Sequence, residues 1–300
     1  MGRIRSFEGL TCLVTGASSG IGREIARELA RRKARLVLTA RRAERLRELS
    51  VELKGLGASF VQVLVADLEH AEEVELLARE AEVHAGPIDV LVNNAGFAVP
   101  GLFPKSDLAR TLAMIRVNVD AAVTLARLLL PGMLARDRGG ILTVASVAGF
   151  SASPVQSAYG GTKAFLRVWS HSLHAELKHT NVAITALCPG VTDTEFFEAA
   201  GFSTTSGFLR WRADAAKVAK KGVAAFAKGK MQLVPGGANK LLMFARRFTS
   251  ERFAAMTARR LMMGRAKALR SRSPNDKAAQ DKAAHDETAR DGTGHGGGSP

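Results

Sequence analysis

Residues 10–29 read LTCLVTGASSGIGREIAREL, a short apolar run followed by a glycine-rich turn and an amphipathic segment. The run at 10–15 predicts a buried strand, and Ile21, Ile25 and Leu29 at spacings of four predict a helix. Glycines at such a turn let the backbone approach a pyrophosphate, and the helix N-terminus offers N–H groups to it. An ordinary turn is the alternative. The contacts expected from a dinucleotide-binding turn are Gly16, Ser18, Ser19, Gly20, Ile21 and Gly22.

The rest of the chain repeats this alternation of short apolar runs with longer amphipathic segments. Further strands are predicted at 35–39, 60–66, 89–93, 140–145, 183–187 and 231–234. Helices are predicted at 21–32, 71–83, 108–130 and 159–178. Strands that alternate with helices and are apolar on both faces are typical of a parallel sheet covered on both sides. The sequence therefore predicts an α/β fold with a doubly wound parallel seven-stranded sheet flanked by helices.

Length, hydrophobicity and cysteine content limit the class of protein. A chain of 300 residues with 46% hydrophobic residues can bury one large core and carry an appendage. No apolar run approaches the roughly 18 residues of a membrane-spanning helix, and the apolar N-terminal run leads into a glycine-rich turn, so no secretion is inferred. Cys12 and Cys188 each lie in a strand-like run, so we expect free thiols and a cytoplasmic location.

The positive charge is concentrated near the C-terminus. The net charge is +15, and residues 210–264 contain thirteen lysines and arginines against two acidic residues. We expect a catalytic domain at 1–236, a basic amphipathic helical extension at 237–270 and a disordered tail at 271–300. Such a helix can lie on an anionic membrane surface as a peripheral contact, or pack against the core or a second subunit. Because the charge is not spread over the catalytic part, no nucleic-acid partner is expected.

The end of the second predicted strand bears on the choice of cofactor. Arg41 and Arg42 stand where an NAD-binding unit usually offers an acidic residue to the ribose 2′-hydroxyl. Arg41 therefore favours a 2′-phosphate, and NADP(H) over NAD(H). The alternative is that both arginines only begin a solvated helix, which Arg45 and Arg47 would continue. A second basic contact is absent from the turn itself, where Ser18 stands.

Polar residues also follow the third and fourth predicted strands. Asp67 closes the third, and Asn94, Ala95 and Gly96 follow the fourth. Ligands bind at the carboxyl ends of parallel strands, so we expect these residues to contact adenine and ribose. Asp67 could instead cap the helix near Ala71, and the asparagines could serve only to fix the loop.

The ordered motifs resemble the classical short-chain dehydrogenase/reductase family over residues 8 to about 235. The motifs are Thr15-Gly-x-x-x-Gly-x-Gly22, Asn93-Asn-Ala-Gly96, Asn118, Ser146, Tyr159-x-x-x-Lys163 and Pro189-Gly190. The resemblance implies a Rossmann-type fold. It also implies that Tyr159 exchanges a proton with the substrate oxygen, that Ser146 hydrogen-bonds that oxygen, and that Asn118 anchors a water for a proton relay.

Tyr159 and Lys163 are four residues apart on a predicted helix and so share a face. A neighbouring ammonium should lower the pKa of the phenol, and the resemblance implies that Lys163 also binds the nicotinamide ribose. A Tyr and a Lys at this spacing would otherwise be a surface pair. His171 and His174 on the same helix have no partners at a metal-ligand spacing, so no metal site is expected.

The segment after the sixth strand resembles the family's nicotinamide-closing loop and substrate lid. Pro189, Gly190, Thr192 and Thr194 are its expected cofactor contacts, although Pro-Gly is also an ordinary turn. Four phenylalanines favour an apolar substrate or simply pack the lid onto the core: Phe196, Phe197, Phe202 and Phe208.

These observations predict an NADP(H)-dependent oxidoreductase that moves a hydride between nicotinamide and a carbonyl or secondary alcohol. The expected substrate is small and lipophilic: a ketone, a 3-oxoacyl group or a steroid-like group. The alternatives are a dehydratase or epimerase on the same fold, and a dinucleotide-binding sensor or scaffold without turnover. The resemblance also implies a homodimer or homotetramer.

Overall fold

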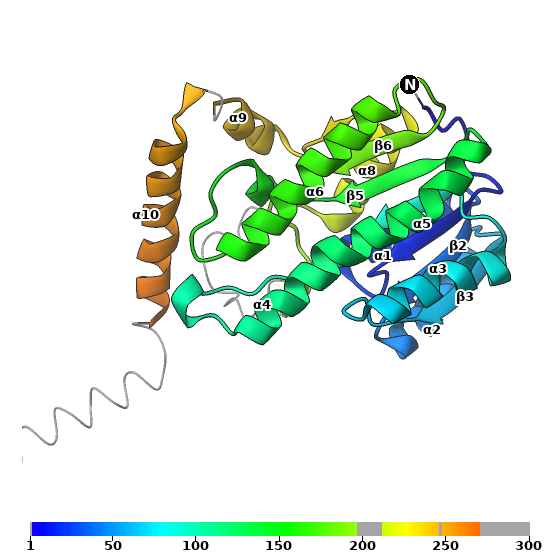
Figure 1. Cartoon of the computed structure of the whole chain (residues 1–300), viewed down its shortest axis with the longest axis horizontal. Coiled ribbons are helices and arrows are strands. Elements are labelled where there is room, and N and C mark those ends of the chain that lie inside the picture. The colour runs from blue at the N-terminus through cyan, green and yellow to red at the C-terminus, as the bar shows by residue number, and fades with distance from the viewer. Residues whose placement is uncertain (1, 197–211, 246–247, 271–300) are drawn as a thin grey trace, which may run out of the picture.

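A seven-stranded parallel sheet forms the centre of the computed structural model, which describes residues 2–196, 212–245 and 248–270 (Figure 1). The strand order is β3-β2-β1-β4-β5-β6-β7. The strands are β1 (Thr11–Thr15), β2 (Arg35–Ala40), β3 (Phe60–Val65), β4 (Val90–Asn93), β5 (Gly140–Val144), β6 (Ala183–Leu187) and β7 (Gln232–Leu233). The predicted doubly wound sheet is confirmed, and its order reverses between β1 and β4, which is where ligands bind such sheets.

Helices cover both faces of the sheet. They are α1 (Gly20–Ala30), α2 (Ala43–Gly55), α3 (Ala71–Ala85), α4 (Leu108–Ile115), α5 (Ala121–Ala135), α6 (Ser157–Glu176) and α8 (Ala215–Ala227). Alternate residues of β1 point to opposite faces. Val14 packs in one core cluster with Ile25 of α1 and Phe226 of α8, and Leu13 packs in another with Leu77 of α3 and Leu125 of α5. All five residues of β1 are buried, which explains its continuous apolar run.

The helix predicted at 108–130 is present, but it contains a π-helical turn that the sequence did not indicate. The structure has α4, then a π-helical turn at Arg116–Asp120, then α5, which continues to Ala135. Single π-helical turns inside α-helices are frequent at functional sites. Here the turn contains Asn118, whose side chain is buried and bonded to neighbouring elements. A wider turn hardly alters the apolar periodicity, so the sequence pattern did not reveal it.

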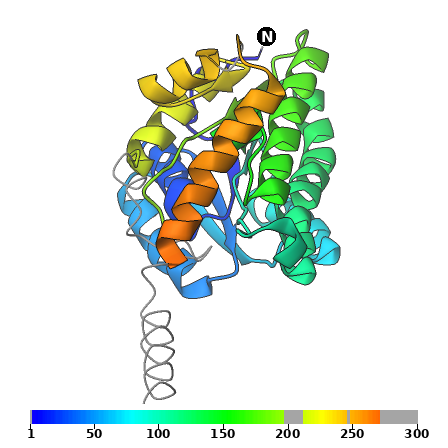
Figure 2. The ribbon, with the colours of Figure 1, turned by 90° about the vertical axis from the view of Figure 1, so that its left-hand side faces the viewer.

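The C-terminal extension is helical, in two pieces. The helices are α9 (Gly237–Ala245) and α10 (Glu251–Arg270). Figures 1 and 2 show α10 across the end of the molecule toward which the carboxyl ends of the strands point. Within the described ranges, no helix combines the length and the apolar character that crossing a membrane requires. The tail predicted at 271–300 lies outside the described residues.

Candidate active site

The glycine-rich turn between β1 and α1 is packed against the end of β4. Gly16 and Gly20 have positive φ angles of 63° and 57°, which glycine adopts without a steric penalty. A Cβ atom on Gly22 would lie 2.3 Å from Nδ2 of Asn94 and 2.5 Å from the carbonyl oxygen of Gly16. The turn therefore leaves no room for a side chain at position 22. Ile21 packs against the core.

Asn94 and Thr15 hold this turn in place. The Asn94 amide donates to the carbonyl oxygens of Thr15 at 2.9 Å and Gly16 at 3.2 Å. The Thr15 hydroxyl accepts from the backbone N–H groups of Asn94 and Ala95 at 2.9 and 3.0 Å. Asn93 donates to the carbonyl of Ala122. The side chains of Asn93 and Asn94 thus both fix the loop, and contact of Asn94 with a cofactor stays a prediction.

The N-terminus of α1 is open to an anion. Ser19 is the N-cap residue, and its side chain makes no capping hydrogen bond. Its hydroxyl instead accepts from Nη2 of Arg42 at 2.7 Å. The Ser19 side chain therefore leaves the first backbone N–H groups of α1 available to another acceptor. A helix start of this kind suits the binding of a pyrophosphate.

Arg42, rather than Arg41, reaches the glycine-rich turn. Nε and Nη2 of Arg42 donate to the Ser18 hydroxyl at 3.2 and 3.1 Å. The Arg42 guanidinium thus supplies a positive charge beside Ser18, the position at which the turn itself has no basic residue. Arg41 lies 3.6 Å from a carboxylate oxygen of Asp67. Sequence reasoning singled out Arg41 and gave Arg42 no separate role, although the second arginine of the pair was the available signal.

Asp67 does not cap α3. The N-cap residue of α3 is His70, and its side chain makes no capping bond. The Asp67 carboxylate accepts from the N–H of Glu69 at 3.1 Å, within its own turn at the carboxyl end of β3. Asp67 therefore lies at the sheet edge beside Arg41.

The structure brings Asn118, Ser146, Tyr159 and Lys163 together at this same edge. The ammonium of Lys163 donates to the carbonyl of Val144 at 2.9 Å. Ser146 follows β5, and its side chain forms a hydrogen bond with that of Tyr159. Tyr159 and Lys163 are 8% and 4% exposed, so water hardly screens either group.

Asn118 is joined to the same cluster through the backbone of Phe97 and the side chain of Thr162. It donates to the carbonyl of Phe97 and to the Thr162 hydroxyl, both at 3.1 Å, and accepts from the N–H of Phe97 at 3.0 Å. A Cβ on Gly96 would lie 2.7 Å from Oδ1 of Asn118 and 3.5 Å from Nζ of Lys163. The absence of a side chain at Gly96 thus lets the backbone pass close to both Asn118 and Lys163.

Burial, rather than the ammonium, sets the pKa of Tyr159. Desolvation raises this pKa to about 12, although the hydrogen bond with Ser146 acts in the opposite direction. The sequence-based expectation that Lys163 lowers it is wrong for the free protein. Nζ of Lys163 lies 5.8 Å from the ring centroid and donates to the backbone. Burial also lowers the pKa of Lys163 to about 8.

The lowered pKa of Lys163 predicts a pH-dependent stability. Between about pH 8 and the ordinary lysine pKa of 10.5, the unfolded chain binds more protons than the folded one, so stability rises with pH. Below pH 8 the cost of the buried charge is constant. We expect the free energy of unfolding of the native chain to gain up to about 3 kcal/mol relative to Lys163→Met over this interval. Urea denaturation of both proteins from pH 7 to 11 measures this; a constant difference would contradict it.

The segment after β6 lies beside the glycine-rich turn. The Thr194 side chain would be 3.1 Å from a Cβ on Gly20, and the Thr192 hydroxyl donates to the carbonyl of Gly190 at 3.0 Å. The carbonyl of Pro189 accepts from the N–H of Val147 at 3.0 Å.

Two further contacts complete the site. A Cβ on Gly190 would lie 2.4 Å from Nδ2 of Asn239, so α9 packs directly on this segment. The sequence did not indicate Asn239 as a site residue, since no pattern in it relates the C-terminal extension to the segment after β6. The ring of Phe196 lies 5.7 Å from that of Tyr159. Phe197, Phe202 and Phe208 lie outside the described residues.

The remaining polar candidates belong to the core. Nδ1 of His174 lies 2.8 Å from the carbonyl oxygen of Ile184. Among the residues that the structure describes, no group of histidine, cysteine and acidic side chains is placed to hold a metal ion. Cys12 and Cys188 are free and buried, as their strand-like surroundings predicted.

Known proteins resemble this chain in sequence. The model of the family described as short chain dehydrogenase matches residues 10–202. A ketoacyl reductase, HetN, of a Nostoc species is 37% identical over 185 residues, which are 62% of this chain and 64% of that protein. A short chain dehydrogenase of Pseudocercospora fijiensis is 37% identical over 190 residues, 63% of this chain and 61% of the other. The matched part thus spans less than two thirds of these two relatives.

Solved structures resemble it in fold. A short-chain dehydrogenase from Sphingobium yanoikuyae in complex with NADPH has a TM-score of 0.71 and 29% identity, with 88% of this chain and 96% of that chain covered. A short chain dehydrogenase/reductase from Burkholderia phymatum in complex with NAD has a TM-score of 0.72 at 24% identity, over 80% of this chain and 93% of the other. The second likeness bears on the fold alone.

Proposed function

Because this chain belongs to the short-chain dehydrogenase/reductase family, we propose that it is an oxidoreductase that transfers a hydride between a nicotinamide dinucleotide and a carbonyl or secondary alcohol carbon. The observation that carries the proposal is the meeting of Asn118, Ser146, Tyr159 and Lys163 beside the glycine-rich turn. A protein that only binds a dinucleotide does not need this buried proton-transfer set.

The chain's residues fit such a cofactor. Gly16 and Gly22 let the turn pack closely against Asn94, where a Cβ would clash, and the start of α1 can receive a pyrophosphate. When bound, the nicotinamide supplies or accepts the hydride. The protein's own residues then handle the proton. Since burial keeps Tyr159 protonated at neutral pH, its hydroxyl can donate to a carbonyl oxygen while Ser146 hydrogen-bonds that oxygen. We assign ribose binding to Lys163 and the anchoring of a relay water to Asn118.

The substrate that we propose is lipophilic. Tyr159 belongs to an apolar cluster with Ala98 and Met114, and Phe97, Val99 and Phe196 pack against that cluster. The test is oxidation of NADPH in the presence of ketones and 3-oxoacyl thioesters graded by chain length. We expect turnover that improves with the length of the apolar part. Turnover of only short, polar carbonyls would contradict the lipophilic substrate, and no turnover of any carbonyl would contradict the oxidoreductase.

We further propose that the cofactor is NADP(H), held at its 2′-phosphate by Arg41 and Arg42. Arg42→Ala should weaken NADPH binding about 10- to 100-fold, since a charge-assisted hydrogen bond contributes about 1.5–3 kcal/mol. NADH binding should change little, and Arg41→Asp should shift the preference toward NAD(H). Calorimetric titration with both cofactors measures these effects. Arg47→Ala is the matched control, because Arg47 pairs with Glu44 on the same helix. Equal losses for NADPH and NADH would mean that the phosphate is held elsewhere.

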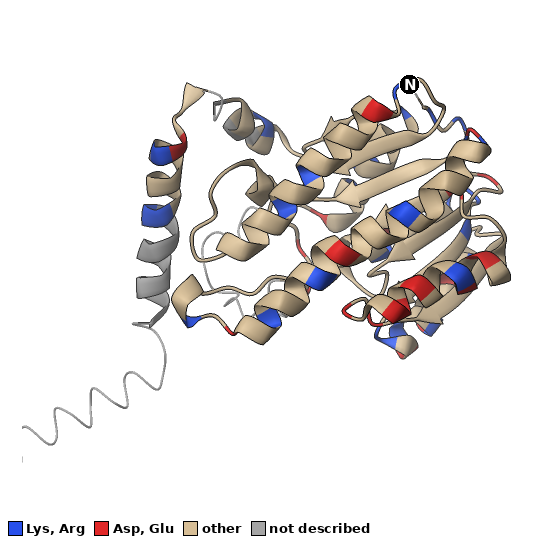
Figure 3. Cartoon of the chain, viewed as in Figure 1, with Lys and Arg blue, Asp and Glu red and all other residues tan. Residues whose placement is uncertain are grey.

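The extension is proposed to contact an anionic membrane surface, with the chain otherwise in the reducing cytoplasm. Exposed apolar residues lie on or between α9 and α10: Leu241, Phe244, Phe248, Phe253 and Met256. Arg252, Arg259 and Arg260 place positive charge on α10 (Figure 3). Changing these three arginines to glutamate should abolish cosedimentation with vesicles that contain anionic lipid. Absence of cosedimentation by the unaltered chain would leave packing against a second subunit as the role of this surface.

We also propose that the chain forms a homodimer or homotetramer. Leu128 on α5 and Phe165 and Val168 on α6 are exposed apolar residues, 44–52% accessible, on helices that flank the sheet. The mass in solution tests this proposal, and a monomer at micromolar concentration would contradict it.

A further inference from the structure

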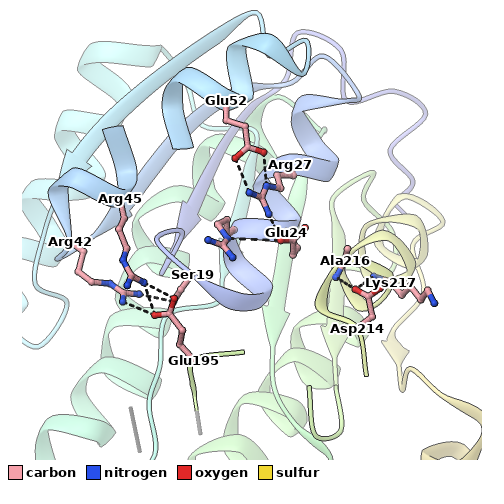
Figure 4. A network of polar contacts seen from close by, with 11 residues as sticks. Ser19, Glu24, Arg27, Arg42, Arg45, Glu52, Glu195, Asp214, Ala216 and Lys217 are labelled. Carbon is pink, nitrogen blue, oxygen red and sulfur yellow. Dashed lines mark hydrogen bonds and ion pairs between the residues drawn. The ribbon is translucent and has the colours of Figure 1, made fainter. Parts of the chain in front are cut away.

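A carboxylate of the chain itself occupies the arginine pocket beside the glycine-rich turn. Glu195, in the segment after β6, accepts from Nη1 of Arg42 at 2.9 Å and from Nη1 of Arg45 at 2.6 Å (Figure 4). Arg42 is at the same time bonded to Ser18 and Ser19 of the turn. This contact joins parts of the chain that are 150 residues apart in sequence.

A phosphate monoester would compete for this position. Guanidinium groups bind carboxylates and phosphates through the same N–H donors. A phosphate carries roughly 1.5–2 negative charges near pH 7, more than one carboxylate. A ribose 2′-hydroxyl is neutral, so it gains little by displacing a carboxylate from two guanidiniums. Hydrogen bonds from Arg42 and Arg45 lower the pKa of Glu195. The carboxylate therefore stays charged at neutral pH, and its release requires a competing anion.

The position of Glu195 also reaches the proton-transfer residues. The next residue, Phe196, places its ring 5.7 Å from that of Tyr159. The backbone N–H of Phe196 donates to the Thr194 hydroxyl at 3.4 Å, and Thr194 lies over Gly20. The ion pairs of Glu195 with Arg42 and Arg45 thus help to fix the position of the Phe196 ring against Tyr159.

Glu195 has room to move away from the arginines. It lines an open cleft of about 410 Å³ together with Arg23, Glu24, Asp193 and Asp214. The three acidic neighbours have partners of their own, which are Arg27, Arg212 and the N-terminus of α8. Arg23 also lines this cleft, with its side chain 40% exposed and its Nε 3.9 Å from a carboxylate oxygen of Glu24. Its guanidinium is therefore a second cation toward which a displaced carboxylate can turn.

We propose that Glu195 determines cofactor specificity: the 2′-phosphate of NADP(H) displaces its carboxylate from Arg42 and Arg45 and thereby releases Phe196 from Tyr159, whereas NAD(H) leaves it seated. The inference rests on the proposed function, because it assumes that Arg42 binds the 2′-phosphate, and it adds Arg45 to that site. Glu195, in the segment after β6 that also contacts Tyr159 through Phe196, would thus change its contacts when the adenosine end of the cofactor carries a 2′-phosphate.

Binding of nucleotides without nicotinamide tests the first step. Calorimetric titrations with 2′,5′-ADP and ADP compare the native chain with Glu195→Gln. We expect the variant to bind 2′,5′-ADP roughly fivefold to tenfold more tightly, on the scale of an exposed ion-pair network, and ADP within about twofold of the native chain. Glu44→Gln is the control, because it removes one negative charge from the same helix as Arg45, where Glu44 pairs with Arg47.

The single tyrosine of the chain reports the second step, since Tyr159 alone gives the NMR signal of carbon-13-labelled tyrosine. We expect 2′,5′-ADP, but not ADP, to shift this signal, and Glu195→Gln to show the shifted signal without nucleotide. A native preference for 2′,5′-ADP with no gain in Glu195→Gln, or with an unmoved tyrosine signal, overturns this inference alone. Weaker ADP binding by the variant would make Glu195 a ribose ligand and also overturn it. A native chain that binds both nucleotides equally overturns the NADP(H) preference, and the inference with it.

Discussion

Tyr159→Phe is expected to lower kcat for carbonyl reduction by about 1000-fold or more while NADPH affinity stays within about twofold. A positioned acid contributes roughly 10²–10⁴-fold to such a reaction. Among the grouped residues, Tyr159 is the one whose hydroxyl is buried, bonded to Ser146 and protonated at neutral pH. Phenylalanine keeps the ring that packs against Phe196 and Met114, so the substitution removes the hydroxyl and little else.

Single-turnover oxidation of NADPH with the best carbonyl of the panel measures this loss, and cofactor fluorescence measures binding. The melting temperature serves as the control for folding, because the variant removes only the contact between the Tyr159 hydroxyl and Ser146, whose own hydroxyl still accepts from the N–H of Ala148. Substantial turnover by Tyr159→Phe would assign the proton to another group. A native chain that binds NADPH tightly but turns over no carbonyl would instead favour the dinucleotide-binding sensor.

The sequence predicted the sheet well because each buried strand is a short run composed mostly of apolar residues. In β1 every residue is buried, and in β2 the run from Leu36 to Ala40 is interrupted only by Thr39, which is itself buried. Such runs depend on local composition alone. The π-helical turn at Asn118 depends instead on side-chain bonds to Phe97 and Thr162, which come from elsewhere in the chain. The sequence around Asn118 does not show these contacts with distant residues, so it could not predict the π-helical turn.

The site followed a similar division. Motif order predicted that Asn94, Ser146 and Tyr159 meet, since the carboxyl ends of parallel strands share one edge of the sheet. The contact of Arg42 with Ser18 and Glu195 depends on the direction of a long side chain and on a loop 150 residues away. The pKa of Tyr159 was misjudged for a related reason. The sequence shows the neighbouring lysine but not the burial that outweighs it.

The second large effect is expected from Gly22→Ala, which should weaken NADPH binding at least about 100-fold and lower the free energy of unfolding by roughly 2–4 kcal/mol. The added Cβ would meet Nδ2 of Asn94 at 2.3 Å and the carbonyl oxygen of Gly16 at 2.5 Å. The first contact forces the Asn94 amide away from the two carbonyls that it bonds. The second is with backbone, which can yield only by moving the turn.

Both consequences have the same origin, because the bonds that Asn94 makes are what holds the turn in the shape that receives a pyrophosphate. Gly55→Ala is the matched control: Gly55 ends α2, and its Cβ would meet nothing within 4 Å. There we expect unchanged NADPH binding and a stability that is equal or up to about 1 kcal/mol higher, since alanine restricts the unfolded chain. Calorimetric titration and urea denaturation of both variants separate the outcomes. A Gly22→Ala protein that loses stability but binds NADPH normally would contradict the role of the turn in cofactor binding. The close packing of the turn would then contribute to the free energy of unfolding but not to NADPH affinity.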